Sequence, residues 1–209
     1  MIASTPLTPG SMAADFERIR ERLCNPNFLA CRGLGNELPV FIYPYDASRE
    51  LDLRAYVSDL ARDSAEGRIL ARDDFATPVH IVHRDAWKTL LDILQTNRIL
   101  DKVPAQELRH GSDALLASIQ KIATPDAFLA ALDYGEHRYG DVVLLSGIGQ
   151  VYPFMRAHLI LEHAQHVFSG GQSTPVPFVM CYPGTWDGQA LRLFGRLGAD
   201  NDYRPSSLI

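Results

Sequence analysis

Short, almost wholly apolar runs alternate with amphipathic stretches along this chain, and this alternation constrains its fold more than any other feature. The clearest runs are 40–43, 141–145 and 176–182, with a weaker one at 78–82 that His80 interrupts. A strand that is apolar at every position must be covered on both faces, which is typical of parallel sheets flanked by helices. Strands that alternate with helices build βα units joined by right-handed crossovers. We therefore predict a single three-layer α/β domain with a mainly parallel sheet and helices on both faces.

The stretches between these runs show helical spacing of their apolar residues. We predict helices over 13–24, 51–65, 86–96, 104–122, 125–137, 153–167 and 187–194. The segment 25–39 is predicted to be a loop because Pro and Gly punctuate it, and SGGQSTP at 169–175 is the one linker-like stretch.

Length and cysteine content bound the class of protein. A chain of 209 residues can bury roughly 70% of its unfolded surface, so it needs no metal or disulfide for stability. We assign 13–209 to the α/β domain and expect 1–12 to be a disordered leader. Cys24, Cys31 and Cys181 lack C-x-x-C spacing, which favours reduced thiols in a cytoplasmic protein. No apolar run approaches the ~20 residues that a membrane helix needs.

The charge balance bears on nucleic-acid binding. The chain carries 20 Lys and Arg against 25 Asp and Glu, a formal net charge of −5. Proteins that bind DNA directly gain affinity by neutralising phosphates and releasing counterions, so they usually present a dense basic face. The sequence contains no dense Lys/Arg cluster. We therefore expect no direct contact with nucleic acid.

Glycines follow the clearest apolar run, in the text Ser146-Gly147-Ile148-Gly149. A strand, a glycine turn and a helix start can present backbone N–H groups to a phosphate. However, Tyr152 stands where the dinucleotide fingerprint needs a third glycine, and no segment contains the P-loop text G-x-x-x-x-G-K-[ST]. A tight turn whose backbone angles only glycine tolerates is the simpler interpretation.

Carboxylates also stand just beyond expected strands, at Asp46, Asp85 and Asp187. Gathered at one edge of the sheet, they could hold Mg²⁺ as in phosphoryl-transfer enzymes. Turn stabilisation and helix capping are the simpler roles, and Asp187 is placed to be an N-cap or first-turn residue. Serine hydrolysis has no support, because Ser146 precedes the glycines and no partner His or acid is identifiable in the sequence.

Histidines cluster in the expected helix 153–167. Spacings of three and four place His158, Glu162 and His166 along one helical face. The text E-H-x-x-H there matches neither H-E-x-x-H nor H-x-x-E-H of the zinc enzymes. A solvated helix face is the favoured interpretation, and a metal site on these three residues is the weaker one.

Aromatic and arginine side chains, which dominate protein–protein interfaces, stand at several expected strand ends and in the tail. They are Tyr43, Tyr45, Tyr152, Phe154, Tyr182, Trp186, Tyr203, Arg156, Arg192 and Arg204. Many aromatics belong to protein cores, and for Phe154 we expect this. The set as a whole, without an ordered catalytic motif, favours a binding surface.

Four blocks of the sequence resemble the BrxB family of the BREX bacteriophage-exclusion systems. The blocks are NELPVFIYPYD (36–46), LLSGIGQVYPFMRAH (144–158), PFVMCYPGTWDGQALRLFG (177–195) and DNDYR (200–204). They occur in the family's order and spacing, and the likeness covers nearly the whole chain from residue 13. The family pattern matches at Asn36, Pro44, Asp46, Gly147, Gly149, Tyr152, Pro153, Arg156, His158, Pro183, Gly184, Asp187, Gly188, Asn201, Tyr203 and Arg204. It departs after Arg204, where this chain continues Pro-Ser-Ser instead of with more aromatic or apolar residues.

The resemblance implies a small cytoplasmic component of a multi-gene phage-defence island. Its neighbours there include a PglZ-type protein of the alkaline-phosphatase superfamily, an adenine-specific DNA methyltransferase and large ATPases. The family has no assigned catalytic activity and implies no cofactor. Its expected role is assembly, with the PglZ-type protein as the direct partner and with contacts to the methyltransferase and ATPase as further candidates.

Two hypotheses follow. The leading one is a non-catalytic adaptor whose candidate partner- or ligand-binding residues are Asp46, Gly147, Gly149, Tyr152, Arg156, Trp186, Asp187, Tyr203 and Arg204. The alternative is a nucleotide-binding or Mg-dependent phosphoryl-transfer enzyme that uses the Gly147/Gly149 turn with Asp46 or Asp187. A degenerate relative of the P-loop fold, which keeps the sheet without the chemistry, would accommodate both.

Overall fold

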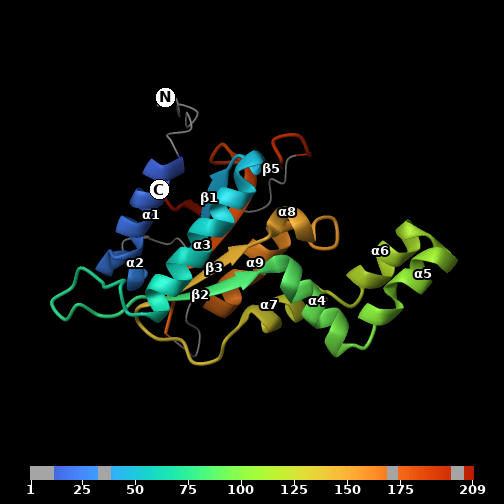
Figure 1. Cartoon of the computed structure of the whole chain (residues 1–209), viewed down its shortest axis with the longest axis horizontal. Helices are drawn as coiled ribbons and strands as arrows, with labels where there is room; N and C mark the ends of the chain where they lie inside the picture. Colours follow the sequence, from blue (N-terminus) through green and yellow to red (C-terminus); the bar gives the residue numbers. More distant parts are fainter. Residues whose placement is uncertain (1–11, 33–38, 169–173, 199–204) are drawn as a thin grey trace.

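A computed structural model describes residues 12–32, 39–168, 174–198 and 205–209 (Figure 1). Its strands are β1 Val40–Tyr45, β2 His80–Asp85, β3 Asp141–Ser146, β4 Phe178–Trp186, β5 Leu191–Leu193 and β6 Ser206–Ser207. Five of them form a parallel sheet in the order β2-β3-β4-β1-β6, and β5 pairs antiparallel with β4. The predicted α/β class with a mainly parallel sheet is confirmed.

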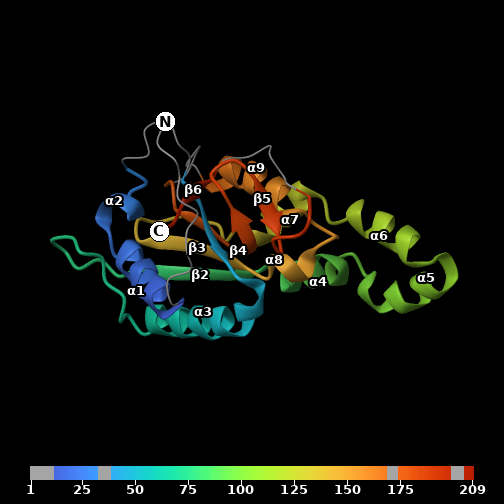
Figure 2. The same ribbon diagram turned by 90° about the horizontal axis from the view of Figure 1, so that it is seen from above.

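Helices cover both faces of the sheet (Figure 2). On one face lie α1 Met12–Leu23, α2 Pro26–Leu29 and α3 Glu50–Ala65; on the other lie α4 Ala86–Thr96, α7 Pro125–Leu132, α8 Ile148–Val151 and α9 Ala157–Phe168. Two short 3-10 turns, η1 Ala47–Arg49 and η2 Leu100–Lys102, precede α3 and the α5 helix described below. Helix α3 connects β1 to β2 and so carries the chain across the sheet past β4 and β3.

The strands supply two hydrophobic cores, because successive side chains of a strand point to opposite faces. Every residue of β3 is buried. Its Val142 and Leu144 pack with the α1–α3 layer, whereas Val143 and Leu145 pack with the layer of α4, α7, α8 and α9. The continuous apolar run in the sequence is thus the consequence of two covered faces.

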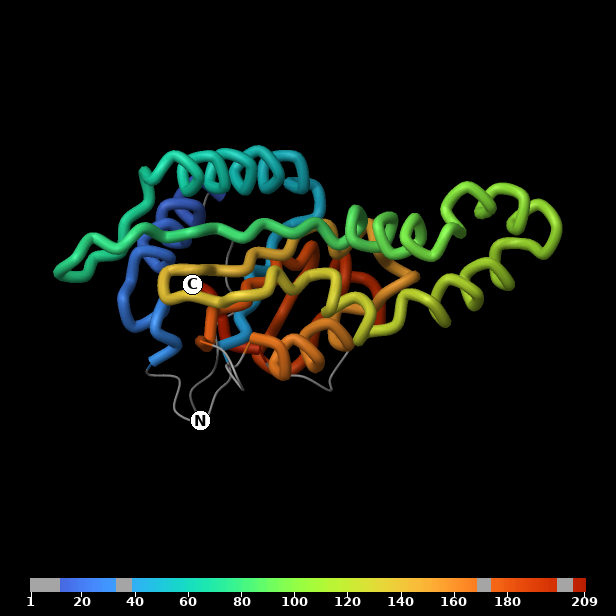
Figure 3. The backbone as a smooth tube through the Cα atoms, turned by 90° about the horizontal axis from the view of Figure 1, so that it is seen from below, coloured from blue at the N-terminus to red at the C-terminus, as the bar shows by residue number. Residues whose placement is uncertain are grey.

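A helical hairpin projects from one end of the molecule (Figure 3). It consists of α5 Val103–His110 and α6 Ser112–Gln120. The prediction of one helix over 104–122 is wrong, because Gly111 adopts φ 81° and reverses the chain between the two helices. Within this hairpin only Ile119 is buried.

Three further helix predictions need correction. The helix expected at 187–194 is a turn followed by β5, and β4 runs on to Trp186. The helix expected at 153–167 starts at Ala157. The helix expected at 125–137 ends at Leu132, because the Asp133 side chain accepts the N–H groups of Tyr134 and Gly135 and turns the chain.

Helix α2 and strand β6 were not predicted from the sequence, and parts of two predicted segments lie outside the described residues. The short helix α2 lies in the segment expected to be a loop; the side chain of Asn25 caps it. Strand β6 extends the sheet beyond β1. Of the expected leader and linker, 1–11 and 169–173 lie outside the described residues.

Among the described helices, no single one is both long and apolar enough to cross a membrane, although the bent pair of α6 and α7 together meets the criteria of length and composition.

The core around the sheet predicts the effect of truncating Phe168. This ring is fully buried and stacks on Phe178 with ring centroids 5.0 Å apart. Phe168→Ala is expected to lower the free energy of unfolding by about 3–5 kcal/mol through the lost contacts and the cavity left behind. Leu108→Ala, at a side chain that is 90% exposed, should change it by less than about 0.5 kcal/mol. Urea denaturation followed by circular dichroism measures both, and equal effects would contradict the placement of the core.

Candidate functional site

The carboxyl ends of β1, β2, β3 and β4 meet at one edge of the sheet, because these strands run parallel. This is the edge where open α/β sheets place their ligands. The segments that follow the strands there contain most of the candidate residues from the sequence. Tyr203 and Arg204 are the exceptions, since both lie outside the described residues.

The candidate carboxylates at this edge accept hydrogen bonds from backbone N–H groups that follow them in the chain. Asp46 accepts the N–H of Ser48 at 2.8 Å and caps η1, and Asp85 accepts the N–H of Lys88 at 3.0 Å and caps α4. Backbone hydrogen bonding by Ser48 lowers the pKa of Asp46. No group of three or more carboxylates or other metal ligands is placed to hold an ion among the described residues, so the alternative of a Mg²⁺ cluster with Asp187 gains no support and the capping roles favoured from the sequence are the ones observed for Asp46 and Asp85.

Asp187 closes the hairpin between β4 and β5. Its carboxylate accepts the N–H groups of Ala190 and Gln189 at 2.8 and 3.0 Å, and Arg192 donates to it at 3.0 Å. These interactions, the Ala190 N–H foremost, lower the pKa of Asp187 to about 2. Asp187 therefore stabilises a turn; the expected helix N-cap role is wrong because no helix follows.

The two glycines after β3 are required by close packing. Gly147 has φ 77°, and a side chain on it would meet Asp85 Oδ1 at 2.9 Å. A Cβ on Gly149 would come within 2.8 Å of the Phe194 ring and 3.1 Å of Pro183. Gly149 thus lets α8 lie directly against the β4–β5 hairpin; the expectation that backbone angles require glycine in this turn holds for Gly147 and not for Gly149.

Ser146 has a partner that sequence reasoning missed. His83 Nε2 lies 2.9 Å from Ser146 Oγ, and the register of the sheet places the two side chains on the same face at the carboxyl edge. Burial lowers the pKa of His83, against the opposing effect of Asp85. Ser146 is only 3% exposed, so its hydroxyl is enclosed in the sheet.

The α3 side of this edge is filled by a polar network. Tyr45 contacts Glu50, Arg54 Nε donates to Glu50 at 2.9 Å, and Arg54 also contacts Gln150 of α8. Tyr45 and Tyr43 are buried, so the expectation that they belong to a binding surface is wrong. Both phenol groups donate hydrogen bonds to carboxylates at the rim of the core. The Tyr43 hydroxyl donates to Asp15 at 3.3 Å, and the Tyr45 hydroxyl donates to Glu50.

The histidine-rich face of α9 offers no metal site in the described structure. His158 is half-buried, Glu162 and His166 are exposed, and His163 Nδ1 lies 2.9 Å from the carbonyl oxygen of Leu159. No group of three or more His, Cys, Asp or Glu side chains is placed to hold a metal ion among the described residues.

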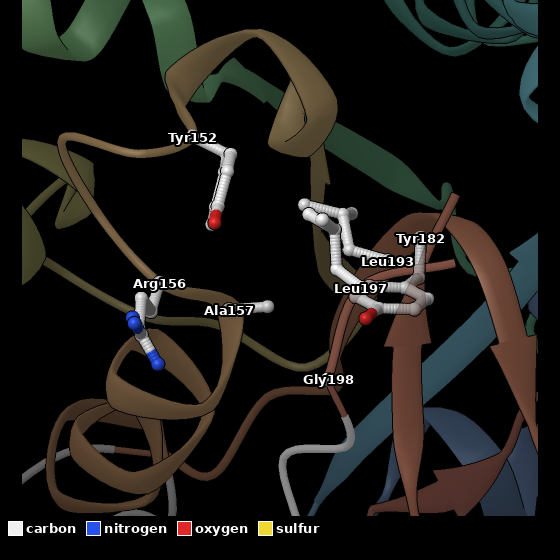
Figure 4. Close-up of a pocket in the computed structure, with 7 residues that line it drawn as sticks. All are labelled: Tyr152, Arg156, Ala157, Tyr182, Leu193, Leu197 and Gly198. Carbon is white, nitrogen blue, oxygen red and sulfur yellow. The ribbon is translucent and has the colours of Figure 1, made fainter. Parts of the chain in front are cut away.

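A pocket of about 210 Å³ opens at the carboxyl edge on the α8–α9 side (Figure 4). It is lined by Tyr152, Arg156, Ala157, Tyr182, Leu193, Leu197 and Gly198. Tyr152 and Arg156 stand on one side and the hairpin residues on the other, with the Tyr152 hydroxyl directed into the space between them. The candidate residues Tyr152 and Arg156 are thereby brought together, and Trp186 and Asp187 belong to the hairpin that forms the opposite wall.

The walls of the pocket are held by the core beneath them. Tyr182 is 1% exposed and forms part of the same hydrophobic cluster as Leu193. Trp186 packs against this cluster, and its buried indole Nε1 donates to no described acceptor. Phe154 is half-buried against Trp87 with ring centroids 6.1 Å apart, which agrees with its expected place in the core.

Leu193 was missed because 187–194 was expected to be a helix, and Leu197 and Gly198, which follow that segment, were not among the candidates. The signal that could have found them is the Asp187-Gly188 dipeptide between two apolar segments, which is typical of a tight β-hairpin turn. Gly184 is required by the close approach of the two strands, since a side chain there would overlap the carbonyl oxygen of Arg192 on the facing strand.

Comparisons with known proteins point to one family. The family model described as "BREX protein BrxB" matches residues 82–208. The chain is 30% identical over 200 residues to the BREX protein BrxB of Bacillus cereus (strain H3081.97), which covers 92% of this chain and 95% of that protein. It is 27% identical over 198 residues to the BREX protein BrxB of Escherichia coli O9:H4 (strain HS), covering 92% and 88% respectively. The comparison with solved structures found no match.

The low pKa of Asp187 predicts an acid transition of the hairpin. The folded pKa of about 2 lies below the ordinary value of 3.8, so the turn is stabilised above that ordinary value and loses this stability as the pH falls toward 2. In a Trp87→Phe background, Trp186 fluorescence is expected to change between these two pH values. Asp187→Asn should remove this transition, whereas Asp74→Asn should leave it unchanged. An identical transition in the Asp187→Asn protein would show that another group causes it.

Proposed function

This chain belongs to the BrxB family of BREX systems, and on that premise we propose that this phage-defence component acts as a non-catalytic assembly protein in the cytoplasm. The observation that supports the proposal is the pocket at the carboxyl edge. Its walls combine tyrosine, arginine and leucine side chains, and Tyr and Arg are among the residues that contribute most to protein interfaces. We propose this pocket and the adjoining β4–β5 hairpin as the docking surface.

The proposed direct partner is the PglZ-type protein that the family resemblance implies, with the BREX methyltransferase and ATPase as further members of the assembly. The pocket is small beside a standard protein interface, which buries roughly 800 Å² on each partner. It therefore serves as the anchor of a larger contact: one partner side chain enters beside Tyr152 and Arg156, and the hairpin around Trp186 supplies the surrounding surface.

The alternative phosphoryl-transfer function receives no support from the geometry of its candidate residues. Gly147 and Gly149 accommodate Asp85 and the Phe194 ring. The carboxylates of Asp46 and Asp187 accept backbone N–H groups of their own turns. Each residue that would serve phosphate or Mg²⁺ thus has a packing or capping role.

The docking proposal predicts that Arg156→Glu weakens binding of a PglZ-type protein from the same defence island. Reversing the charge in the pocket wall should cost about 2 kcal/mol or more, or roughly 30-fold in Kd. Tyr152→Ala should have an effect of the same order. Binding is measured by co-purification and by calorimetry on the two purified proteins.

Arg109→Glu provides the matched control, because Arg109 is exposed on α5, away from the pocket. It should leave the Kd unchanged. Wild-type proteins that fail to associate at micromolar concentration would refute the partner, whereas equal losses for Arg156→Glu and Arg109→Glu would refute the surface.

The absence of catalysis is tested with nucleotides. Calorimetric titration of the chain with ATP, GTP and NAD in the presence of Mg²⁺ is expected to give no binding heat, since the side chains that would hold them serve the fold. Asp46→Ala should then lower only the stability of the fold, through loss of the cap on η1. Turnover of a nucleotide or phosphoester that Asp46→Ala abolishes would establish the alternative function.

A further inference from the structure

The indole of Trp186 carries a hydrogen-bond donor that the described structure leaves without an acceptor. Its Nε1 is buried from solvent, and no described residue accepts a hydrogen bond from it. The ring itself is half-buried and packs against the hydrophobic cluster on the α8–α9 side of the sheet. A buried N–H group that has lost its bond to water and gained no other destabilises the folded state, so native proteins contain few of them. The position of this ring therefore needs an explanation beyond packing.

Strand β4 leaves the sheet just before Trp186. Its pairing with β3 ends at Met180 and its pairing with β1 ends at Pro183. From Gly184 to Trp186 it pairs with β5 alone among the described strands. The β4–β5 hairpin thus extends past the carboxyl edge as a two-stranded ribbon. Such a ribbon is marginally stable by itself, so its tilt against the sheet depends on what packs against it.

A second unfavourable feature lies at the other end of this ribbon. Phe194, which directly follows β5, has φ 57°, a left-handed conformation that bulky side chains seldom adopt. Backbone strain of this kind persists only where surrounding contacts hold it, and it is frequent at ligand-binding sites. Here the Phe194 ring lies over Gly149 of α8, where an added Cβ would come within 2.8 Å of it. The described position of the hairpin therefore combines one strained residue with one unpaired donor.

We propose that the Trp186 indole N–H donates a hydrogen bond to a carbonyl oxygen of the partner protein, and that a tilt of the hairpin on docking makes it available. The inference rests on the docking surface proposed above and names the hydrogen bond that completes it. Leu193 and Leu197, which flank the Phe194 turn, line the pocket beside Tyr152. A partner side chain that enters the pocket therefore acts on the same turn that fixes the position of the ribbon.

The surroundings of Trp186 fit a neutral acceptor. Indole has one N–H donor and no acceptor, so its partner must supply an oxygen with a free lone pair. The nearest charges in the hairpin are already matched, because Arg192 donates to the Asp187 carboxylate at 3.0 Å. A carbonyl oxygen satisfies the indole without adding an unmatched charge to the hairpin.

An isosteric replacement of the indole N–H tests the free chain. In Trp87→Phe protein, Trp186 is the one remaining tryptophan, and biosynthetic incorporation of β-(3-benzothienyl)alanine exchanges its N–H for sulfur with little change in ring size. Because an unpaired donor is removed, we expect the Tm of the free chain to rise by about 2–4 °C. The same exchange at Trp87 in Trp186→Phe protein is the matched control. It should change the Tm less, because the Trp87 indole is not left buried without a partner in the described structure.

Binding should respond in the opposite direction. The benzothienyl chain is expected to bind the PglZ-type protein about three- to tenfold more weakly than its Trp87→Phe parent, because the complex loses one hydrogen bond. This ratio should be the same at low and high salt, as a neutral acceptor requires. The exchange at Trp87 should leave the Kd of its own parent unchanged. Calorimetry on the purified proteins measures all of these values.

The outcomes separate this inference from the proposed function. A lower Tm in the benzothienyl chain would show that the free protein already holds an acceptor for Trp186. An unchanged Kd in a complex that Arg156→Glu still weakens would overturn the inference and leave the docking surface in place. A loss of affinity that disappears at high salt would overturn the carbonyl acceptor. Failure of the unsubstituted proteins to associate would refute the docking surface and the inference together.

Discussion

The burial of β1, β3 and β4 on both faces is the constraint on which the rest of the structure depends. Each of these strands must supply side chains to two cores at once, as Val142 and Val143 do in neighbouring positions of β3. Helices are therefore needed on both faces, and the long crossover from β1 to β2 provides the first of these layers. Polar groups are excluded from the middle of the strands and collect at the strand ends, where backbone turns can use them.

Much of this architecture was predictable from the chain, and the failures have physical causes. The apolar strands and most helices were found because their periodicity is local. The break at Gly111 was missed because helical spacing continues through it on either side, although glycine there costs the helix stability. The hairpin after β4 was misassigned because the apolar spacing of 187–194 also fits a helix, while the Asp187-Gly188 turn signal was not weighed.

The candidate site was less predictable than the fold. Tyr152 and Arg156 were identified as interface-type side chains near a strand end and from the family text, but the pocket also needs Leu193, from a segment with the wrong predicted structure, and Leu197 just after it. The contact between His83 and Ser146 depends on which strands are neighbours, and nothing local in the sequence fixes the order of strands in a sheet. Sequence patterns thus located Tyr152 and Arg156 on one wall of the pocket. The opposite wall depends on the pairing of β4 with β5 in three dimensions.

The α5–α6 hairpin is expected to open more easily than the rest of the molecule. Because it buries only Ile119 and most of its hydrogen bonds lie within its own two helices, opening it exposes little apolar surface and leaves both cores intact. Such a unit exchanges its amide hydrogens by local opening, well before the sheet does. We accordingly expect its tip at Gly111 to tolerate added residues, because lengthening an exposed turn costs only a little loop entropy.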